Sequence, residues 1–335
     1  MRKSRRFPGE GSAVLSTDSS IDVIFGPVPS RRLGRSLGIN NIPPKTCSYA
    51  CIYCQLGRAV KMRIRRQSFY EPDSICHLVQ GSVNRLRKLR ETVDYFAFVS
   101  DGEPTLDRNL GTSIEMLKPL GIPVAVISNG SLITRQDVRT DLNSADWVSM
   151  KVDAVSENLW RMINRPHGNL DLSQIQENLI AFRKDFAGIF TTETMLIQGI
   201  NNTQTAFLAT ADFLRRLDPD IVYLSVPTRP PADRNVRPAD SASIDSARQI
   251  FSASVKRVEM LTGYEGNAFT TTSDIRRDVL SIAAVHPLRQ DALYEMLDKA
   301  GASWQVIEEM LENQEIIQFE FQGNVFFLKN LSQGN

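Results

Sequence analysis

Cysteine and histidine are rare in this chain, which has four cysteines and three histidines among 335 residues. So few cysteines exclude a disulfide-stapled scaffold, and we expect them to stay reduced, as in the cytoplasm. Apolar runs are short as well, and none approaches the roughly 20 residues of a membrane-spanning helix. Neither sign of charge prevails, because the formal net charge is only +1. Overall charge therefore favours no class of partner.

The first 20 residues, MRKSRRFPGEGSAVLSTDSS, are basic and then small and polar. They do not contain the apolar core of a signal peptide. We therefore expect a disordered lead-in over residues 1–20, no association with a membrane, and a cytoplasmic location for the protein.

Three of the four cysteines are crowded into the stretch KTCSYACIYCQLGR (45–58). Cys47, Cys51 and Cys54 follow the spacing C-x3-C-x2-C. One interpretation is a zinc site, but structural zinc takes four Cys or His ligands, and the remaining cysteine, Cys76, falls within a predicted helix. An iron–sulfur cluster fits better, because three thiolates on a four-iron cluster leave one iron open to another ligand.

The C-x3-C-x2-C spacing is the signature of the radical SAM superfamily, and this sequence resembles that family. The resemblance implies a [4Fe–4S] cluster whose open iron binds S-adenosylmethionine. It also implies an electron donor such as flavodoxin or ferredoxin, and a 5′-deoxyadenosyl radical that removes hydrogen from a substrate. Tyr53, just before the third cysteine, matches the family pattern and would lie near the adenine. A plain loop anchor is the alternative interpretation of Tyr53.

The rest of the chain predicts a matching fold, because apolar strand-like runs alternate with helical patterns. The strand-like runs are 36–42, 94–100, 123–129, 147–153, 191–198 and 221–227. The helical patterns cover about 72–90, 108–119, 134–143, 173–186, 203–217 and 241–259. We therefore predict an α/β fold over residues 21–270, a partial (β/α)6 TIM-like barrel with a parallel sheet.

Functional groups of parallel barrels lie at the carboxyl ends of the strands. After the second predicted strand, SDGEPTL (100–106) resembles the GGEP segment of the family. The resemblance implies that Gly102 and Glu103 help to hold the methionine amino group of the cofactor, although Asp101 replaces the first glycine. Taken alone, DGEP is typical of a simple turn.

Later strands end in further candidates: Ser128 and Asn129 after the third strand, Lys151 and Asp153 after the fourth, and Ser225 after the sixth. The resemblance implies that these strand ends contact the ribose, carboxylate and adenine of S-adenosylmethionine. Lys151 and Asp153 lie two residues apart and point to the same side of a strand. A structural ion pair between them is the alternative.

Several features bear on the substrate. A second cluster is excluded, because only Cys76 remains to bind it. The segment FGPVPSRRLGRSLGINNIPPKTC (25–47) resembles an uncharacterised branch loosely grouped with wyosine-type tRNA-modifying radical SAM enzymes, which carry an extra cluster. Between Arg58 and Arg90, nine Lys and Arg face two acidic residues. Such a stretch binds RNA phosphates or forms a solvated helix face. The loop 228–238, with three arginines, is a second candidate for binding anions.

Residues 276–330 predict three amphipathic helices and a hairpin about a Gly-Asn turn, typical of a winged-helix-like module. Residues 276–335 contain five Lys and Arg against nine Asp and Glu, so this module is a poor phosphate binder. We expect it to bind a partner or to act as a lid. The substrate is then RNA, which the basic stretch favours, or a protein or peptide, as for an activase of a glycyl-radical partner. A non-catalytic zinc- or cluster-binding adaptor is a third interpretation.

Overall fold

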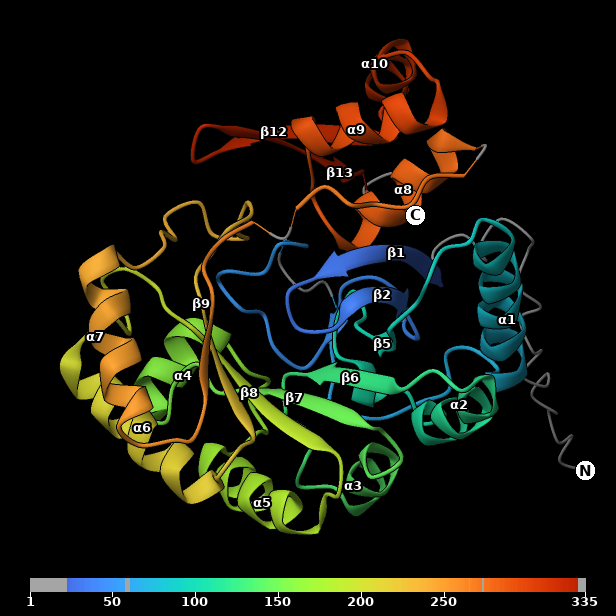
Figure 1. Ribbon diagram of the computed structural model, residues 1–335. Coiled ribbons are helices and arrows are strands. Elements are labelled where there is room, and N and C mark those ends of the chain that lie inside the picture. Colours follow the sequence, from blue (N-terminus) through green and yellow to red (C-terminus); the bar gives the residue numbers. More distant parts are fainter. Residues whose placement is uncertain (1–22, 58–60, 265, 273, 331–335) are drawn as a thin grey trace, which may run out of the picture.

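The computed structural model describes residues 23–57, 61–264, 266–272 and 274–330 (Figure 1). The lead-in expected over residues 1–20 lies outside this part of the chain. Eight strands form one sheet in the order β1-β2-β5-β6-β7-β8-β9-β10, parallel from β2 onward, with β1 antiparallel to β2. The strands are β1 (Ile24–Ser30), β2 (Gly34–Ile39), β5 (Tyr95–Phe98), β6 (Val124–Ser128), β7 (Trp147–Lys151), β8 (Ile189–Met195), β9 (Ile221–Ser225) and β10 (Val258–Leu261).

Helices cover the outer face of this curled sheet, which forms a half-barrel (Figure 1). They are α1 (Pro72–Lys88), α2 (Leu110–Leu117), α3 (Gln136–Leu142), α4 (Glu157–Asn164), α5 (Leu172–Asp185), α6 (Gln204–Leu217) and α7 (Ser241–Ser252). The predicted partial barrel is confirmed, because each of the six predicted strands is followed by a helix. None of the described helices is long and apolar enough to cross a membrane.

Two strands at the margins of the sheet differ from the prediction. The pattern over 241–259 predicts one helix, but α7 ends at Ser252 and the chain then enters β10 beside β9. Strand β1 is not predicted, because Pro27 and Pro29 cannot donate to a ladder. The sheet tolerates them because β1 is an edge strand whose pairing is irregular between Phe25 and Val28.

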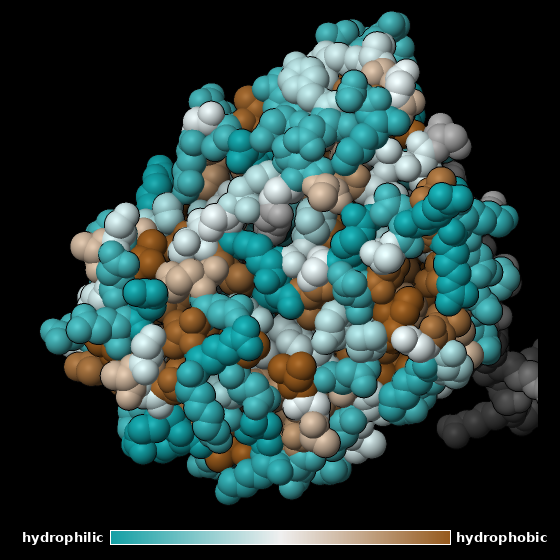
Figure 2. All heavy atoms as spheres, in the orientation of Figure 1, coloured by the Kyte–Doolittle hydropathy of each residue, from teal (hydrophilic) through white to brown (hydrophobic). Residues whose placement is uncertain are grey.

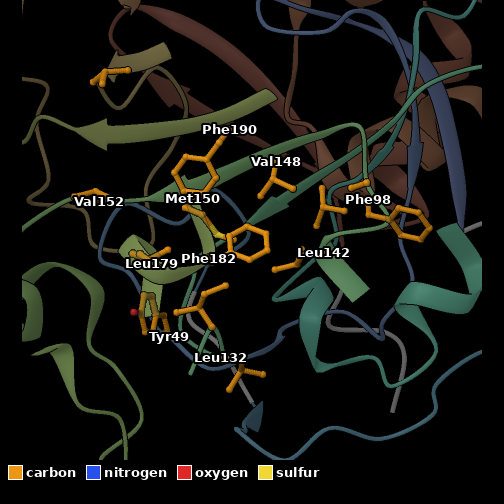
Figure 3. Close-up of a cluster of buried hydrophobic side chains, with 14 of the residues drawn as sticks. Tyr49, Phe98, Leu132, Leu142, Val148, Met150, Val152, Leu179, Phe182 and Phe190 are labelled. Atoms are coloured by element: carbon orange, nitrogen blue, oxygen red, sulfur yellow. The ribbon is translucent and has the colours of Figure 1, made fainter. Parts of the chain in front are cut away.

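The outer face of the sheet is buried against the helices. Val148 and Met150 of β7 and Phe190 of β8 are fully buried, and Phe182 of α5 packs over them (Figure 3). The ring centroids of Phe182 and Phe190 are 6.0 Å apart. Burying each such side chain contributes about 1.5–3 kcal/mol. This packing gives the strand ends a rigid support.

The turn between β1 and β2 enters the inside of the half-barrel. Leu33 of this turn is buried against Ala97, Trp147 and Tyr223, which point inward from the strands. Arg31, two residues earlier, donates to the carbonyl of Gly263, just past β10. The turn therefore joins the two margins of the open sheet across its interior.

The chain after β10 forms a separate group of elements beside β1 (Figure 1). They are α8 (Ile275–Val285), β11 (Leu288–Arg289), α9 (Gln290–Ala300), α10 (Gln305–Glu312), β12 (Ile316–Phe321) and β13 (Asn324–Lys329). Their three strands form an antiparallel sheet in the order β11-β13-β12. We call residues 275–329 the C-terminal segment. Its winged-helix character and the domain boundary near residues 270–276 stay predictions.

The C-terminal segment shares a core with the barrel. Phe25 and Val28 of β1 are buried in one apolar cluster with Ile275, Val279 and Ile282 of α8. The surface of the segment is mostly hydrophilic on the face shown at the top of Figure 2. Its buried apolar residues therefore attach it to β1 and fill its own interior.

Candidate active site

One cavity of about 360 Å³ lies where the carboxyl ends of the parallel strands meet the cysteine loop, which spans residues 45–57. This volume is within the usual range for small-molecule sites. Most of the predicted site residues line its wall, namely Cys47, Cys51, Tyr53, Cys54, Gly102, Glu103, Ser128, Asn129, Lys151 and Ser225. The parallel strands bring the last six of these residues together, because the carboxyl ends of the strands share one edge of the sheet.

The cysteine loop is fixed by backbone hydrogen bonds. Cys47 ends the short strand β3 (Thr46–Cys47), which pairs with β4 (Lys61–Met62). The amides of Ala50 and Ile52 donate to carbonyls at the end of α4, at 3.0 and 2.9 Å. These bonds hold the loop across the mouth of the half-barrel, with its thiols on the cavity wall.

All three cysteines of this loop are half-buried, and burial raises the pKa of each thiol. For Cys51, burial and the nearby carboxylate of Asp153 raise the pKa to about 12. The side-chain amide of Asn164 donates to Cys51 Sγ at 3.4 Å. Bound metal would supply the positive charge that keeps these thiols deprotonated. The donor set on this wall therefore fits an iron–sulfur cluster held by three thiolates.

The fourth cysteine lies elsewhere. Cys76 is within α1, and its Sγ lies 3.5 Å from the carbonyl oxygen of Met116. It is not part of the cavity wall. The fold therefore does not bring Cys76 to the cysteine loop, as a zinc site built from these four cysteines would require.

The loop after β5 is pressed against the cysteine loop. A Cβ atom on Gly102 would lie 1.8 Å from the carbonyl oxygen of Thr46. The amide of Glu103 donates to that same oxygen at 3.1 Å. Asn40, just past β2, donates to Asp101 at 3.0 Å and accepts from its amide at 3.1 Å. The glycine thus serves the contact between the two loops and also lines the cavity.

Glu103 is buried and joins two strand ends. Its Oε1 accepts hydrogen bonds from the Thr105 amide and hydroxyl, at 3.1 and 2.6 Å, and from the Ser128 hydroxyl at 2.7 Å. Its Oε2 accepts from the Asn129 amide at 2.7 Å. Burial raises the pKa of Glu103, although these donors oppose the shift. Oε1 is fully used, whereas Oε2 has capacity for one more donor from the cavity.

Asn129 extends this arrangement to the cysteine loop. Its side-chain amide donates to the Ser48 hydroxyl at 2.9 Å and contacts Cys47 Sγ at 3.6 Å. Ser128 and Asn129 therefore hold Glu103 and one thiol in position, besides lining the cavity.

A cluster of charges faces the cavity from inside the half-barrel. Glu193 of β8 accepts from Lys151 of β7 at 2.6 Å and from the Ser225 hydroxyl at 2.9 Å, and it pairs with Arg32 of the β1–β2 turn. Burial alone would raise the pKa of Glu193, but Lys151 and Arg32 hold it well below its usual range. The alternative pairing of Lys151 with Asp153 is wrong. Lys151 instead meets Glu193, its register partner on the next strand.

The span from residue 41 to residue 214 matches the family model described as the radical SAM superfamily. The chain belongs to the radical SAM superfamily. It is therefore an enzyme of the radical SAM type, and membership implies S-adenosylmethionine and an iron–sulfur cluster as its cofactors. The matched span contains the cysteine loop and the ends of strands β5 to β8.

Relatives of this radical SAM chain include uncharacterised proteins. The UPF0026 protein MJ1312 of Methanocaldococcus jannaschii is 44% identical over 311 residues, 92% of this chain and 96% of the relative. A UPF0026 protein of Helicobacter pylori (strain J99) is 32% identical over 214 residues, 63% of this chain and 68% of that protein. A solved radical SAM methyltransferase from Sphaerobacter thermophilus has a TM-score of 0.52 at 15% identity, covering 68% of this chain and 66% of that chain. This last likeness shows a shared fold.

Asp153, predicted to contact the radical SAM cofactor, is not among the residues that line this cavity. Its Oδ2 accepts from the Asn164 side chain at 2.7 Å and from the Tyr53 hydroxyl. Its Oδ1 accepts from the amide of Met195 at 2.9 Å. Asp153 thus orients Tyr53 and, through Asn164, the thiol of Cys51. The loop-anchor interpretation of Tyr53 agrees with this bond, while its ring still faces the cavity.

Segments outside the radical SAM match complete the cavity. Arg229, after β9, donates to Gln55 of the cysteine loop at 2.6 Å and to His286 Nε2 at 2.5 Å. Gln55 donates to the carbonyl of Val285 at 2.8 Å. Val285 and His286, at the end of α8, also line the cavity. The C-terminal segment is therefore hydrogen-bonded to the residue next to Cys54. The sequence does not predict this contact, because no local pattern marks Gln55.

The basic residues after the cysteine loop are of two kinds. Arg63 and Arg65 are exposed. Arg66 is buried, donates to two backbone carbonyls at 2.9 and 2.6 Å, and forms an ion pair with Asp141. Arg66 therefore stabilises the loop after β5 and is not available to RNA. Arg58 lies outside the described residues.

Proposed function

We propose that this radical SAM enzyme holds a single [4Fe–4S] cluster through Cys47, Cys51 and Cys54 and binds S-adenosylmethionine beside it. The observation that carries this proposal is that three thiols line one cavity while Cys76 lies in α1. Three thiolates leave one iron of a four-iron cluster open to the methionyl group. When bound, the cluster supplies the electron that cleaves S-adenosylmethionine into methionine and a 5′-deoxyadenosyl radical, which takes a hydrogen atom from the substrate.

The residues of this chain bind and orient the cofactor. We assign Glu103 Oε2 to the methionyl ammonium, because this oxygen accepts only one protein hydrogen bond among the described residues. Asn129 and Lys151 line the wall where polar groups of the cofactor would lie, and Tyr53 offers a ring to the adenine. Gly102 lets the two supporting loops meet.

Three further residues act through their neighbours. The Ser128 and Ser225 hydroxyls are engaged with Glu103 and Glu193, so they position those carboxylates. Asp153 orients Tyr53 in the same way. We therefore treat these residues as positioning residues for the cofactor site.

Superfamily chemistry also needs a reductant. We propose a flavodoxin or ferredoxin as the electron donor, and the cytoplasm as the compartment, because free thiols stay reduced there. The described part of the chain has four free cysteines, in keeping with this proposal.

RNA is the substrate class that we favour. Exposed Arg63 and Arg65 lie a few residues after the cysteine loop in the sequence, and Lys45 lines the cavity at the start of the loop. These cations would attract phosphates toward the cavity. A protein or peptide substrate is the alternative, and it is favoured by the placement of the acidic C-terminal segment against the cavity.

Iron content and S-adenosylmethionine cleavage test the cofactor assignment. Anaerobically reconstituted protein should hold about four irons per chain. The variants C47A, C51A and C54A should each lose this cluster, while the matched control C76A keeps it. With dithionite and S-adenosylmethionine, the wild type should release 5′-deoxyadenosine. Stoichiometric zinc without iron would instead support the non-catalytic adaptor.

The substrate class needs a separate experiment. Reduced enzyme is supplied with cellular RNA and with a protein fraction, and each fraction is assayed for modification that depends on S-adenosylmethionine. Modification of RNA with steeply salt-dependent binding supports the first class, because each neutralised phosphate releases counterions. Modification of the protein fraction alone supports the alternative.

A further inference from the structure

Two cations share one carboxylate inside the half-barrel. Lys151 and Arg32 both pair with Glu193, and all three residues line the cavity. The side chains of Arg32 and Lys151 are 17% and 19% exposed. Lys151 alone would balance the charge of Glu193. Arg32 therefore leaves the group with a net positive charge. Burying an extra charge is costly, so its presence is not explained by stability alone.

The hydrogen bonds of this group leave donors directed at the cavity. Arg32 carries five N–H donors and Lys151 three. Among the described residues, the guanidinium of Arg32 donates only to Glu193, and the ammonium of Lys151 donates only to the same carboxylate. In the described part of the chain, the remaining donor atoms of Arg32 and Lys151 are not among the buried side-chain atoms that lack a hydrogen-bond partner. These donors therefore face the cavity and can bind a ligand.

Aromatic rings hold the two cations in place. The Arg32 guanidinium lies 6.0 Å from the ring centroid of Tyr223, and the Lys151 ammonium lies 5.4 Å from that of Tyr53. Such contacts orient a cation without using its hydrogen-bond donors. The guanidinium is therefore fixed, while most of its donors stay open to an incoming group.

Arg32 comes from a segment that the superfamily match leaves out. The match begins at residue 41, whereas Arg32 is in the turn between β1 and β2. Leu33, its neighbour, anchors this turn against Ala97 and Tyr223 inside the half-barrel. The turn therefore adds a charged side chain to the cavity from outside the part of the chain shared with the superfamily. This is where we expect a feature specific to the substrate.

We propose that Arg32 binds an anionic group, a phosphate or a carboxylate, on the part of the substrate that enters the cavity. The guanidinium fork matches both groups, because each offers two oxygens to parallel N–H donors. Glu193 sets the position of both cations. This inference rests on the proposed function, since it names the chemistry of the substrate of that same site.

Anion binding by the reconstituted holoenzyme tests the proposal. Inorganic phosphate, succinate and the neutral analogue succinamide are titrated by calorimetry in low-chloride buffer, with S-adenosylmethionine present at saturation. Phosphate or succinate should bind, and succinamide should not. The variant R32Q should bind the anion about tenfold more weakly or worse, since a charged hydrogen bond is lost, and R32K should recover part of the affinity. Stronger binding of phosphate than of succinate assigns a phosphorylated substrate, and the reverse assigns a carboxylated one.

R183Q is the matched control. Arg183 also pairs with a carboxylate, Asp220, and lies over an aromatic ring, that of Phe190, but away from the cavity. The R183Q variant should bind anions with the affinity of the wild type. Equal affinity of R32Q and the wild type, or equal binding of succinamide, would overturn the proposal. Iron content, measured on the same samples, reports separately on the proposed function, because loss of iron from the wild type would remove the cofactor assignment and not the anion site.

Discussion

The carbonyl oxygen of Thr46 lies so close to Gly102 that a Cβ atom at position 102 would be 1.8 Å from it. The oxygen belongs to the backbone, so it cannot move aside as a flexible side chain would. This contact joins the cysteine loop to the loop after β5, and it makes position 102 a sensitive test of how the site is supported.

The variant G102A should separate these two loops. We expect a loss of about 3 kcal/mol or more in the free energy of unfolding and poor retention of iron after reconstitution. G81A is the control, because a Cβ atom at Gly81 in α1 meets nothing within 4 Å. It should stabilise the protein by about 0.5–1 kcal/mol, since Ala is the better helix former. Denaturant unfolding and iron analysis measure both effects. A stable G102A variant that keeps its iron would show that the close contact between Gly102 and Thr46 is not needed to support the site.

Replacement of Glu103 should affect S-adenosylmethionine more than iron. In E103Q the new side-chain amide N–H is a donor, and it faces another donor, either the Asn129 amide or the cofactor ammonium. Binding of S-adenosylmethionine should therefore weaken about tenfold to a hundredfold. S128A removes only one of three donors to Oε1 and should have a smaller effect. Equilibrium dialysis with labelled cofactor gives both affinities. Unchanged affinity in E103Q would remove the role assigned to Oε2.

Glu193 should contribute to stability at neutral pH and lose that contribution in acid. Its pKa is depressed in the folded protein, so the folded state binds fewer protons than the unfolded state, whose carboxyl titrates at about pH 4.3. The contribution is therefore complete above about pH 5 and falls as the pH decreases below about 4.3. E193Q, which leaves Arg32 and Lys151 without their carboxylate, should lose about 3 kcal/mol at pH 7.

The difference between the wild type and E193Q isolates the contribution of Glu193 from those of other carboxylates. Urea unfolding at several pH values should show the two stabilities converging as the pH falls to about 3. A difference that stays constant over this range would mean that Glu193 is not held ionised by its two partners.

Arginines after the cysteine loop should divide by burial. R63S/R65S removes two exposed cations, so RNA binding should weaken, and the slope of log affinity against log salt should flatten by about 1.4. R215S/R216S, on exposed positions of α6, is the control and should leave the slope unchanged. Fluorescence anisotropy at several salt concentrations gives the slopes. If both double variants behave like the wild type, these arginines do not bind RNA.

Arg66 should instead behave as a core residue. R66S leaves Asp141 and two backbone carbonyls without their donor, so we expect a loss of about 3–5 kcal/mol in the free energy of unfolding. Thermal or urea unfolding checks this value. A change within about 0.5 kcal/mol, as at ordinary surface positions, would contradict the structural role of Arg66.

The contact of the C-terminal segment with the cysteine loop should control its attachment. Q55A and H286A each remove bonds that tie α8 to the loop or to Arg229. We expect amide exchange in α8 to become about tenfold faster, since one net bond is worth about 1 kcal/mol or more. Q305A is the control, because within the described residues the Gln305 side chain bonds to Glu309 of the same helix, α10. Mass spectrometry measures the amide exchange. Equal exchange in all three variants would show that the apolar contact with β1 is enough to hold the C-terminal segment.

The cysteine triad, the alternation of strands and helices, and the polar residues at strand ends could all be predicted from the sequence. These features follow from local rules: ligand spacing, the periods of apolar residues, and the shared edge of parallel strands. Such rules are enough to assign residues as far apart in the chain as Glu103 and Asn129 to one site.

Which side chains meet depends on how the strands and loops pack in three dimensions. Lys151 pairs with Glu193 and not with Asp153, because strand register places a neighbour on the next strand closer than a residue on its own strand. Arg66 is buried while Arg63 is exposed, although both belong to one basic run. No local pattern singles out Arg32, because its role depends on a turn that crosses the inside of the half-barrel. Such contacts join residues far apart in the chain, and their geometry arises only when the strands and loops pack together.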